Sequence, residues 1–180
     1  FDAQAANLLG ATFLGGTNLD LGLALILDAE ARPVLTGETY SGDFPTTADA
    51  FDRTHGGTWE RDGFVTWIDP AGPGVLWSSF LGGGDYDSGW DVELAGPDAL
   101  VVTGPTRSLD FPITAGAYDG SYNGGQEDGY VCRLAPFATS GAGPEALRPR
   151  PLRLGPNPFR LSIELSFDLR GAGEVRILAF

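Results

Sequence analysis

A tandem internal repeat constrains the fold of this chain more than any other feature of its sequence. An offset of 67 residues carries Asp43-Phe44-Pro45 onto Asp110-Phe111-Pro112, and small insertions place the counterpart of Asp62-Gly63 at Asp128-Gly129. A period held over several landmarks in the same order indicates tandem structural units.

Each unit is predicted to contain four short strands rich in Val, Phe, Trp and Leu, as half-buried pleated segments are. In the central copy these strands are Gly63–Ile68, Val75–Leu81, Trp90–Leu94 and Ala99–Thr103. The flanking parts supply Asn7–Leu14, Leu23–Leu27 and Pro33–Thr36 on the N-terminal side and Gly129–Leu134 on the C-terminal side. Four antiparallel strands per unit are typical of a β-propeller blade, so the predicted fold is all-β with two four-stranded blade-like repeats.

Two blades are too few to close a propeller, which typically needs about four or more. The sequence leaves three alternatives open: a piece of a longer array, an assembly of several copies, or a two-sheet sandwich. We expect Gly129–Leu134 to pair with the N-terminal sheet, and we expect exposed strand edges that invite pairing with other chains.

Composition and charge narrow the classes of function. The 27 Gly and 13 Pro residues beside 42% hydrophobic residues indicate a turn-rich folded protein. The net charge of −13, with every basic residue an Arg, disfavours nucleic acid and anionic membranes as partners. No apolar run is long enough to span a bilayer. The absence of Met suggests a removed leader or a fragment.

Three segments divide the chain. Residues 1–137 hold the repeats, and residues 138–151 form a linker that is rich in Pro and Gly. Residues 152–180 are predicted to form a short C-terminal β-hairpin from Leu161–Leu169 and Glu174–Phe180.

The repeat resembles the SBBP family of bacterial β-propeller repeats. The resemblance rests on Ser79-Phe80-Leu81-Gly82-Gly83, Val102-Thr103-Gly104, Asp43-Phe44-Pro45-Thr46-Thr47 and Asp62-Gly63-Phe64-Val65, and it covers about residues 8–137. It implies a secreted or cell-surface bacterial protein with propeller blades and no known enzymatic activity. The family usually carries more repeats than this chain does.

The tail is similar to the start of Ig-like C-terminal modules of secreted bacterial proteins. Pro156-Asn157-Pro158-Phe159 before an alternating strand matches the opening of these modules. Some of them act as secretion sorting domains, and a related module occurs in flagellar hook-capping proteins. The resemblance implies a truncated module or one that another chain completes.

A Gly-flanked acidic loop is the candidate metal site. Asp85, Asp87 and Asp91 alternate in it, and Asn18 and Asp20 stand at the equivalent positions of the first copy. Ca²⁺ favours alternating oxygen ligands on a flexible turn. The alternative is that these side chains cap turns by bonding to backbone N–H groups.

The repeated Asp-Phe-Pro motif is interpreted as structural. Asp43 and Asp110 are expected to accept backbone hydrogen bonds, Phe44 and Phe111 to fill pockets between blades, and Pro45 and Pro112 to fix the exit of the chain. The motif would then connect one blade to the next.

Six aromatic or reactive positions complete the candidates. Trp59 lies in a loop insertion that the second copy lacks and is the best candidate for an exposed, glycan-binding aromatic. The other three tryptophans, Trp67, Trp77 and Trp90, are expected in the core. His55, the sole histidine, lacks an obvious partner for catalysis, and Cys132, the sole cysteine, is expected as a small buried hydrophobe.

The sequence therefore predicts a non-catalytic, secreted or cell-surface structural or adhesive protein. It would self-associate, and one form of this assembly would be an extracellular polymer built through exposed strand edges. The alternative is a carbohydrate- or calcium-binding module of a larger secreted protein.

Overall fold

The computed structural model describes residues 7–8, 10–57, 60–70, 72, 74–96 and 99–137, together with the strand segments 164–167 and 175–178. The chain divides into two compact units, residues 1–141 and residues 142–180. All of the regular structure in the described residues is β-strand, so the all-β prediction is confirmed.

Four strands form the first sheet, called sheet A. They are β1 (Asp20–Leu27), β2 (Pro33–Thr39), β3 (Asp62–Ile68) and β4 (Val75–Leu81). Each strand pairs antiparallel with the next, in the order β1-β2-β3-β4. The register sets Phe64 opposite Phe80 and Trp67 opposite Trp77, so bulky side chains meet as cross-strand pairs.

Three strands form the second sheet, called sheet B. They are β5 (Asp91–Leu94), β6 (Leu100–Thr106) and β7 (Asp128–Leu134), paired antiparallel in that order. In the C-terminal unit, β8 (Glu164–Phe167) and β9 (Val175–Leu178) pair antiparallel, within the hairpin that the sequence predicts there. The predicted linker, residues 138–151, lies outside the described residues.

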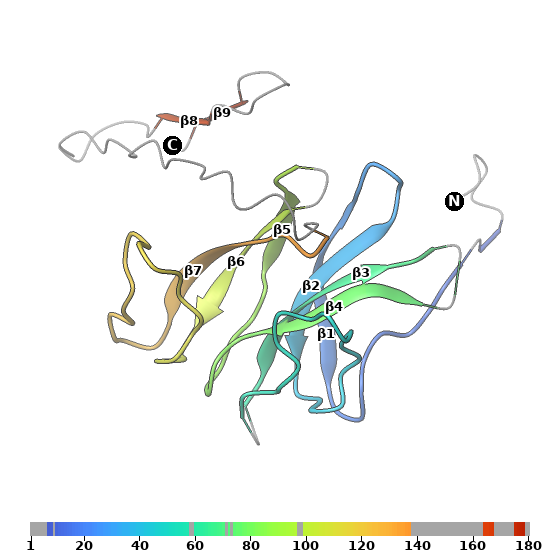
Figure 1. Ribbon diagram of the computed structural model, residues 1–180, viewed down its shortest axis with the longest axis horizontal. Helices are drawn as coiled ribbons and strands as arrows, with labels where there is room; N and C mark the ends of the chain where they lie inside the picture. The colour runs from blue at the N-terminus through green and yellow to red at the C-terminus, as the bar shows by residue number, and fades with distance from the viewer. Residues whose placement is uncertain are drawn as a thin grey trace. The chain divides into compact units, whose positions relative to one another are not determined.

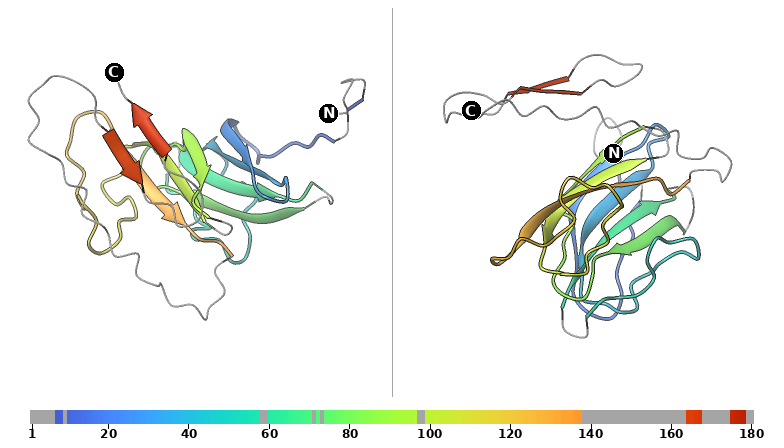
Figure 2. Two further views of the ribbon diagram at one scale, coloured as in Figure 1. Left: turned by 90° about the horizontal axis from the view of Figure 1, so that it is seen from above. Right: turned by 60° about the vertical axis from the view of Figure 1, so that its left-hand side comes forward.

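The two sheets pack against each other within the N-terminal unit, with β5 in contact with β1 and β2 (Figures 1 and 2). The core draws on both sheets: its buried members are Val34, Val65, Trp67, Trp77, Leu81, Val92, Leu100, Val102, Phe111 and Tyr130. Cys132 is half-buried at the margin of this core. Burial of so many large apolar side chains between two layers is the main force that holds the unit together.

A smaller apolar cluster packs on a different part of sheet A. Phe44, from the β2–β3 connection, places its ring 4.5 Å from that of Phe64 and 6.1 Å from that of Phe80. Leu14 and Leu35 pack against these three rings. Phe64 alternates with the core residues Val65 and Trp67, so the connection between β2 and β3 covers part of the face of sheet A turned away from sheet B.

The structure differs from the sequence prediction in how strands are grouped. The four strands of the central copy do not form one sheet, because β3 and β4 belong to sheet A while β5 and β6 belong to sheet B. The crossing segment is 82–90, where Asp87 N donates to Arg61 O and Gly89 N donates to Gly37 O. These bonds tie the segment to sheet A before it enters sheet B.

Two further predictions about connectivity are wrong for the same reason. Gly129–Leu134 pairs with β6 and not with the N-terminal sheet, whose β2 is already paired with β3. The Asp-Phe-Pro motifs lie between β2 and β3 and between β6 and β7, so each connects strands of one sheet instead of joining two sheets.

The predicted strand Asn7–Leu14 is also wrong for its described residues, which have no strand conformation. Its counterpart β4 is held by pairing with β3. Residues 10–14 pair with no strand of the described part of the chain, and Phe13 is fully exposed. A segment of strand-like sequence without a partner strand cannot satisfy its backbone in a ladder.

Candidate functional site

The acidic candidates lie at two structurally equivalent corners. In the first corner, Asp20 Oδ2 accepts hydrogen bonds from Gly16 N (2.8 Å) and Ser41 Oγ (3.0 Å). Its Oδ1 accepts a short bond from Thr39 Oγ1. The carboxylate therefore links the chain before β1 to the end of β2 and to Ser41 beyond it. We call such a hydrogen-bonded junction a corner.

The second corner repeats these contacts 67 residues later. Asp87 Oδ2 accepts from Gly83 N (2.7 Å) and from Ser108 Oγ (2.7 Å), and Asp85 N donates to Ser108 Oγ (2.9 Å). In the first corner Asn18 N donates to Ser41 Oγ at the same 2.9 Å. The repeat thus preserves a hydrogen-bond pattern as well as a sequence pattern.

The Asp-Phe-Pro motif completes both corners. Asp43 Oδ1 accepts from Thr17 N at 2.9 Å, and Asp110 Oδ1 accepts from Gly84 N at 2.8 Å. The bond from Thr17 N, followed by that from its hydroxyl, holds the pKa of Asp43 below its ordinary value against the effect of burial.

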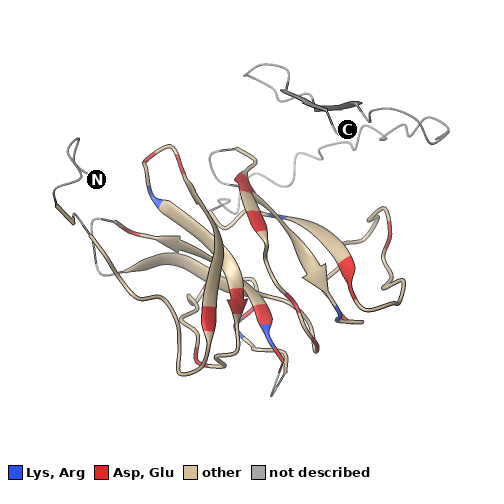
Figure 3. Ribbon diagram, turned by 180° about the vertical axis from the view of Figure 1, so that it is seen from behind, with Lys and Arg blue, Asp and Glu red and all other residues tan. Residues whose placement is uncertain are grey.

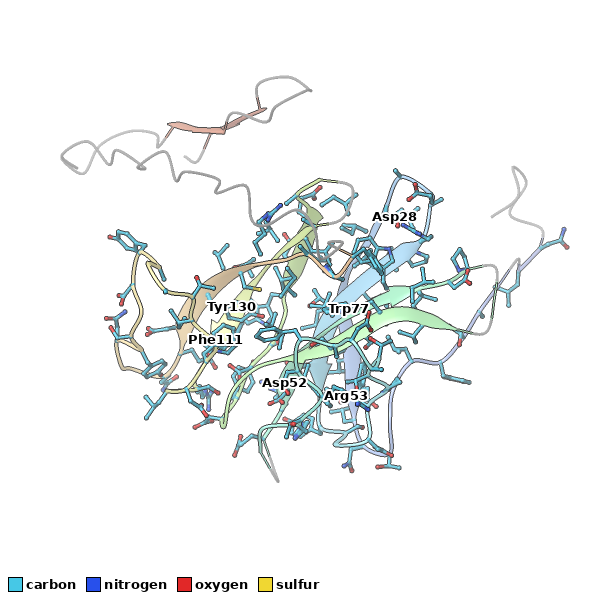
Figure 4. The ribbon with its side chains drawn as sticks, viewed as in Figure 1. Asp28, Asp52, Arg53, Trp77, Phe111 and Tyr130 are labelled. Atoms are coloured by element: carbon cyan, nitrogen blue, oxygen red, sulfur yellow. The ribbon has the colours of Figure 1, made fainter. Side chains whose placement is uncertain are left out.

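The aromatic members of the motif are buried against the third strand of their own sheet. Phe111 lies beside Tyr130, with ring centroids 4.4 Å apart (Figure 4), as Phe44 lies beside Phe64 in sheet A. Pro45 and Pro112 follow these rings and lie half-buried. Asp, Phe and Pro in this order fix the corner, cover the strand and redirect the chain.

The five calcium candidates do not form one cluster. Asn18 and Asp20 belong to the first corner, and Asp85 and Asp87 belong to the second. Asp91 is exposed and accepts a bond from Val92 N. No group of three or more His, Cys, Asp or Glu suited to a metal ion occurs among the described residues. Calcium binding by these side chains stays a prediction.

Two carboxyl groups stand out because they are buried completely. Asp62 at the start of β3 is 1% exposed, and Asp87 is 0% exposed. Burial raises the pKa of Asp62 to about 6, against the opposing hydrogen bond from Gly56 N. Burial also raises the pKa of Asp87, against opposing hydrogen bonds from the Thr106 side chain, from Gly83 N and from the Ser108 side chain. Acidic side chains dominate the described charged residues as a whole (Figure 3).

His55 is held by the backbone. Its Nδ1 lies 2.7 Å from Gly57 O and its Nε2 lies 3.1 Å from Thr39 O. Its ring packs edge-on against Phe80 with centroids 5.5 Å apart. Both ring nitrogens thus face carbonyl oxygens and not a hydroxyl or thiol that a catalytic base would activate.

His55 also borders an open pocket of about 450 Å³. The pocket is lined by Asn18, Tyr40, Gly42, Arg53, Thr54, His55 and Gly57. A second pocket of about 290 Å³ lies beside Gly82–Gly84 and includes Asp52 and Gly56.

The tryptophans divide between core and surface. Trp67 and Trp77 are buried, as expected, but Trp90 is 57% exposed, so its prediction as a core residue is wrong. Trp90 immediately precedes β5, which lies at the edge of its sheet in the described part of the chain. Trp59, the predicted glycan-binding residue, lies outside the described residues.

The most conspicuous surface was not identified from the sequence. Leu21, Leu23, Leu25 and Leu27 of β1 are 39%, 46%, 57% and 54% exposed. A bulge between Gly22 and Ala24 shifts the register of β1, so Leu21 pairs with Glu38 whereas Leu25 pairs with Leu35 and Leu27 with Pro33. Glu38 and Leu35 lie on opposite sides of β2, so Leu21 does not share the side of Leu25. We call Leu25 and Leu27 the leucine face. The alternation of Leu25 and Leu27 was the available signal, because alternate residues of a regular strand share one side.

Comparison with known proteins identifies no family for this chain. No protein-family model matches it, and no curated protein matches it. The resemblances to SBBP repeats and to the sorting modules therefore stay predictions. Within the described residues no helix is long and apolar enough to cross a membrane.

Proposed function

We propose that this chain is a non-catalytic structural β-repeat protein that self-associates by covering its leucine face with a second copy. The proposal rests on one observation: the repeat relates exposed residues of β1 in sheet A to residues of β5 that are buried between the sheets. In this proposal sheets A and B are successive propeller-type blades, and the secreted or cell-surface location rests on the resemblance to SBBP repeats.

The repeat relates the leucine face to a surface that is buried in the same molecule. The offset of 67 carries Leu25 onto Val92 and Leu27 onto Leu94. Val92 is 1% exposed, and both Val92 and Leu94 pack in the core between the sheets. The face of sheet B that packs on sheet A therefore has its counterpart in the leucine face.

Neighbouring strands extend the equivalence. Leu35 of β2 corresponds to Val102 of β6, and Phe64 of β3 corresponds to Tyr130 of β7. Val102 and Tyr130 are buried between the sheets. In sheet B this surface packs on sheet A. The equivalent surface of sheet A could receive a further sheet in the same way.

The uncovered side of sheet B is a poor match for the leucine face. It carries Asp91, Glu93 and Arg133 where sheet A has Ala24, Ile26 and Trp67. Stacking this side on the leucine face would bury charges against leucines, which is costly. An open chain of molecules stacked sheet A on sheet B is therefore disfavoured.

The leucine face is instead complementary to itself. Its strand carries no charge between Leu21 and Leu27, so two copies can bury it without repulsion inside the contact, although each chain has a net charge of −13. A surface that matches itself produces a closed two-fold dimer. Contiguous exposed apolar patches of this kind mark interaction surfaces.

Sedimentation velocity over a range of concentrations tests the proposal. We expect a particle of twice the 18.9 kDa chain mass, and we expect Leu25→Asp to shift it to the monomer while circular dichroism stays unchanged. Val131→Asp is the matched control, because Val131 is 76% exposed on sheet B. A monomeric native chain, or a dimer that Leu25→Asp leaves intact, contradicts the proposal.

A carbohydrate-binding role is the second candidate, and the pocket beside His55 is the observation that favours it. Tyr40 offers a ring, while Arg53 and Asn18 offer hydrogen-bonding groups around about 450 Å³ of space. Binding of the native chain on a glycan array, lost in Arg53→Ala, would support this role. An array without signal removes it.

A further inference from the structure

Asp62 and Asp87 bring two buried carboxyl groups to the junction between the sheets. Asp62 begins β3 of sheet A, and Asp87 lies in the segment that leads from β4 into sheet B. Asp87 also forms an isolated bridge with Thr106, the last residue of β6. The pair therefore stands where the two sheets are joined, and its state is independent of the leucine face.

Each carboxyl group has one oxygen that is satisfied and one that is not. Asp62 Oδ2 accepts from Gly56 N at 2.7 Å, and Asp87 Oδ2 accepts from Gly83 N and Ser108 Oγ, both at 2.7 Å. Oδ1 of Asp62 and Oδ1 of Asp87 are buried without a hydrogen-bond partner. A buried acceptor without a partner is costly and calls for a ligand or a proton.

The two groups converge over Gly82. A Cβ built on Gly82 would lie 2.7 Å from Asp87 Oδ2 and 3.1 Å from Asp62 Oδ1. Only a residue without a side chain leaves this space to the carboxyl groups. Neither carboxylate forms an ion pair within the described part of the chain.

The surrounding charges do not neutralise the pair. His55 favours the ionised form of Asp62, while Asp52 and Asp87 oppose it. Asp110 opposes ionisation of Asp87. The nearest guanidinium along the chain, that of Arg61, is engaged by Glu38 at 2.5 Å. Two like charges at short range in a buried site are unfavourable, and binding one proton removes the repulsion.

We propose that Asp62 and Asp87 bind one proton between them in mildly acidic solution, forming an acid–carboxylate hydrogen bond that latches the junction of the two sheets. The proton comes from solvent and sits on Asp62 Oδ1, from which it is donated to a carboxylate oxygen of Asp87. The pocket beside Gly82–Gly84, lined also by Asp52 and Gly56, gives solvent a route to the junction.

A proton suits this donor set better than a metal ion. Calcium takes about six to eight oxygen ligands, whereas the junction offers two carboxyl groups whose Oδ2 atoms already accept N–H or O–H bonds. No larger group of metal-binding side chains occurs among the described residues.

Carboxyl ¹³C NMR titration of aspartate-labelled protein tests the proposal, because this signal reports Asp groups and not His55. We expect a titration near pH 6, in line with the raised pKa of Asp62, that disappears in Asp62→Asn. In Asp87→Asn the midpoint of Asp62 should fall, since the like charge is gone. Ordinary midpoints for every aspartate in the native chain overturn the proposal even when neither variant folds.

Thermal melting supplies a second readout. A group with a raised folded pKa stabilises the fold at low pH, and this stabilisation is lost as the pH rises through about 6. The melting temperature of the native chain should therefore fall as the pH rises from the ordinary aspartate value of 3.8 to about 6. It should fall less in Asp62→Asn. Asp128→Asn, at the half-exposed counterpart of Asp62, should keep the native slope. An equal slope in Asp62→Asn overturns the latch.

Addition of calcium chloride above the titration midpoint distinguishes the proton from a metal ion. We expect no change in melting temperature relative to sodium chloride of the same ionic strength. A calcium-specific rise that Asp62→Asn abolishes would mean that the pair holds a metal ion, and it would overturn the proton assignment.

Discussion

Val92 and Leu25 occupy equivalent positions of the repeat, yet Val92 is 1% exposed and Leu25 is 57% exposed. The difference arises from which side of the sheet each residue occupies: Val92 packs in the core between the sheets, whereas Leu25 lies outside that core. Equivalent positions of the repeat are therefore buried in the interface in sheet B and exposed in sheet A. The proposed self-association follows from this contrast.

Phe44→Ala should lower the free energy of unfolding by about 3–5 kcal/mol, as truncation of a buried Phe does. Phe44 is 3% exposed, and its ring contacts those of Phe64 and Phe80. Urea unfolding measures the loss. Phe51→Ala is the control, because Phe51 is 55% exposed in the same connection. A loss for Phe44→Ala no larger than that of the control would place Phe44 outside the core.

Asp28→Asn should lower the free energy of unfolding by about 1–3 kcal/mol near neutral pH, because charge-assisted hydrogen bonds are lost. Asp28 Oδ2 accepts from Trp67 Nε1 at 2.7 Å and from Arg32 Nε at 2.6 Å. Glu30→Gln is the control, since the exposed Glu30 carboxylate pairs with the Nη2 of the same Arg32.

The cost of Asp28→Asn should depend on pH. Burial works to raise the pKa of Asp28, but the bonds from Arg32 and Trp67 outweigh it and hold the pKa below its ordinary value. The stabilisation is therefore present above the ordinary value and lost as the pH falls through the folded one. Urea unfolding at several acidic pH values should show the gap between native chain and variant closing. A gap independent of pH contradicts this account.

Gly89→Ala should destabilise the packing of the two sheets by about 1–3 kcal/mol, the usual cost of overpacking. A Cβ on Gly89 would lie 2.0 Å from Thr36 Oγ1, and Gly89 N donates to Gly37 O at 3.0 Å. Thermal melting measures the effect. Gly42→Ala, with no atom within 4 Å of its Cβ, should melt almost as the native chain does. Equal melting of both variants would rule out the tight contact.

Tyr86→Leu should cost about 1–2 kcal/mol because two cation–π contacts are lost. The ring of Tyr86 lies 3.8 Å from the Arg61 guanidinium and 4.8 Å from that of Arg107. Arg61 precedes β3 of sheet A and Arg107 follows β6 of sheet B, so the ring links the sheets. Tyr86→Phe should retain most of the stability by urea unfolding. A matching loss in Tyr86→Phe would assign the effect to the hydroxyl.

The sequence predicts strands better than it predicts sheets. Val75–Leu81 is a strand with the expected bounds, because its strand-favouring residues and the turn before it are local signals. Which strands share a sheet depends on segment 82–90, whose crossing is fixed by backbone bonds to Arg61 and Gly37. Such long-range bonds leave no local pattern, so the boundary between sheets was placed at the wrong loop.

The same limit applies to the candidate site. The repeat marked Asp62 and Asp87 as landmarks, but their burial and convergence over Gly82 depend on how the sheets are joined. Trp90 was assigned to the core because it begins the predicted strand Trp90–Leu94, yet it is exposed. The leucine alternation in β1 is visible in the sequence, yet it acquires meaning only when the equivalent strand β5 is seen to be covered.

The most direct test of the self-association is an isotope-filtered NOE experiment on a mixture of leucine-labelled and unlabelled chains. We predict intermolecular NOEs between the methyl groups of Leu25 and Leu27, which form the leucine face, and none from the exposed control Leu109. NOEs confined to the edge strands β4 or β7, or none between chains at all, would contradict the account.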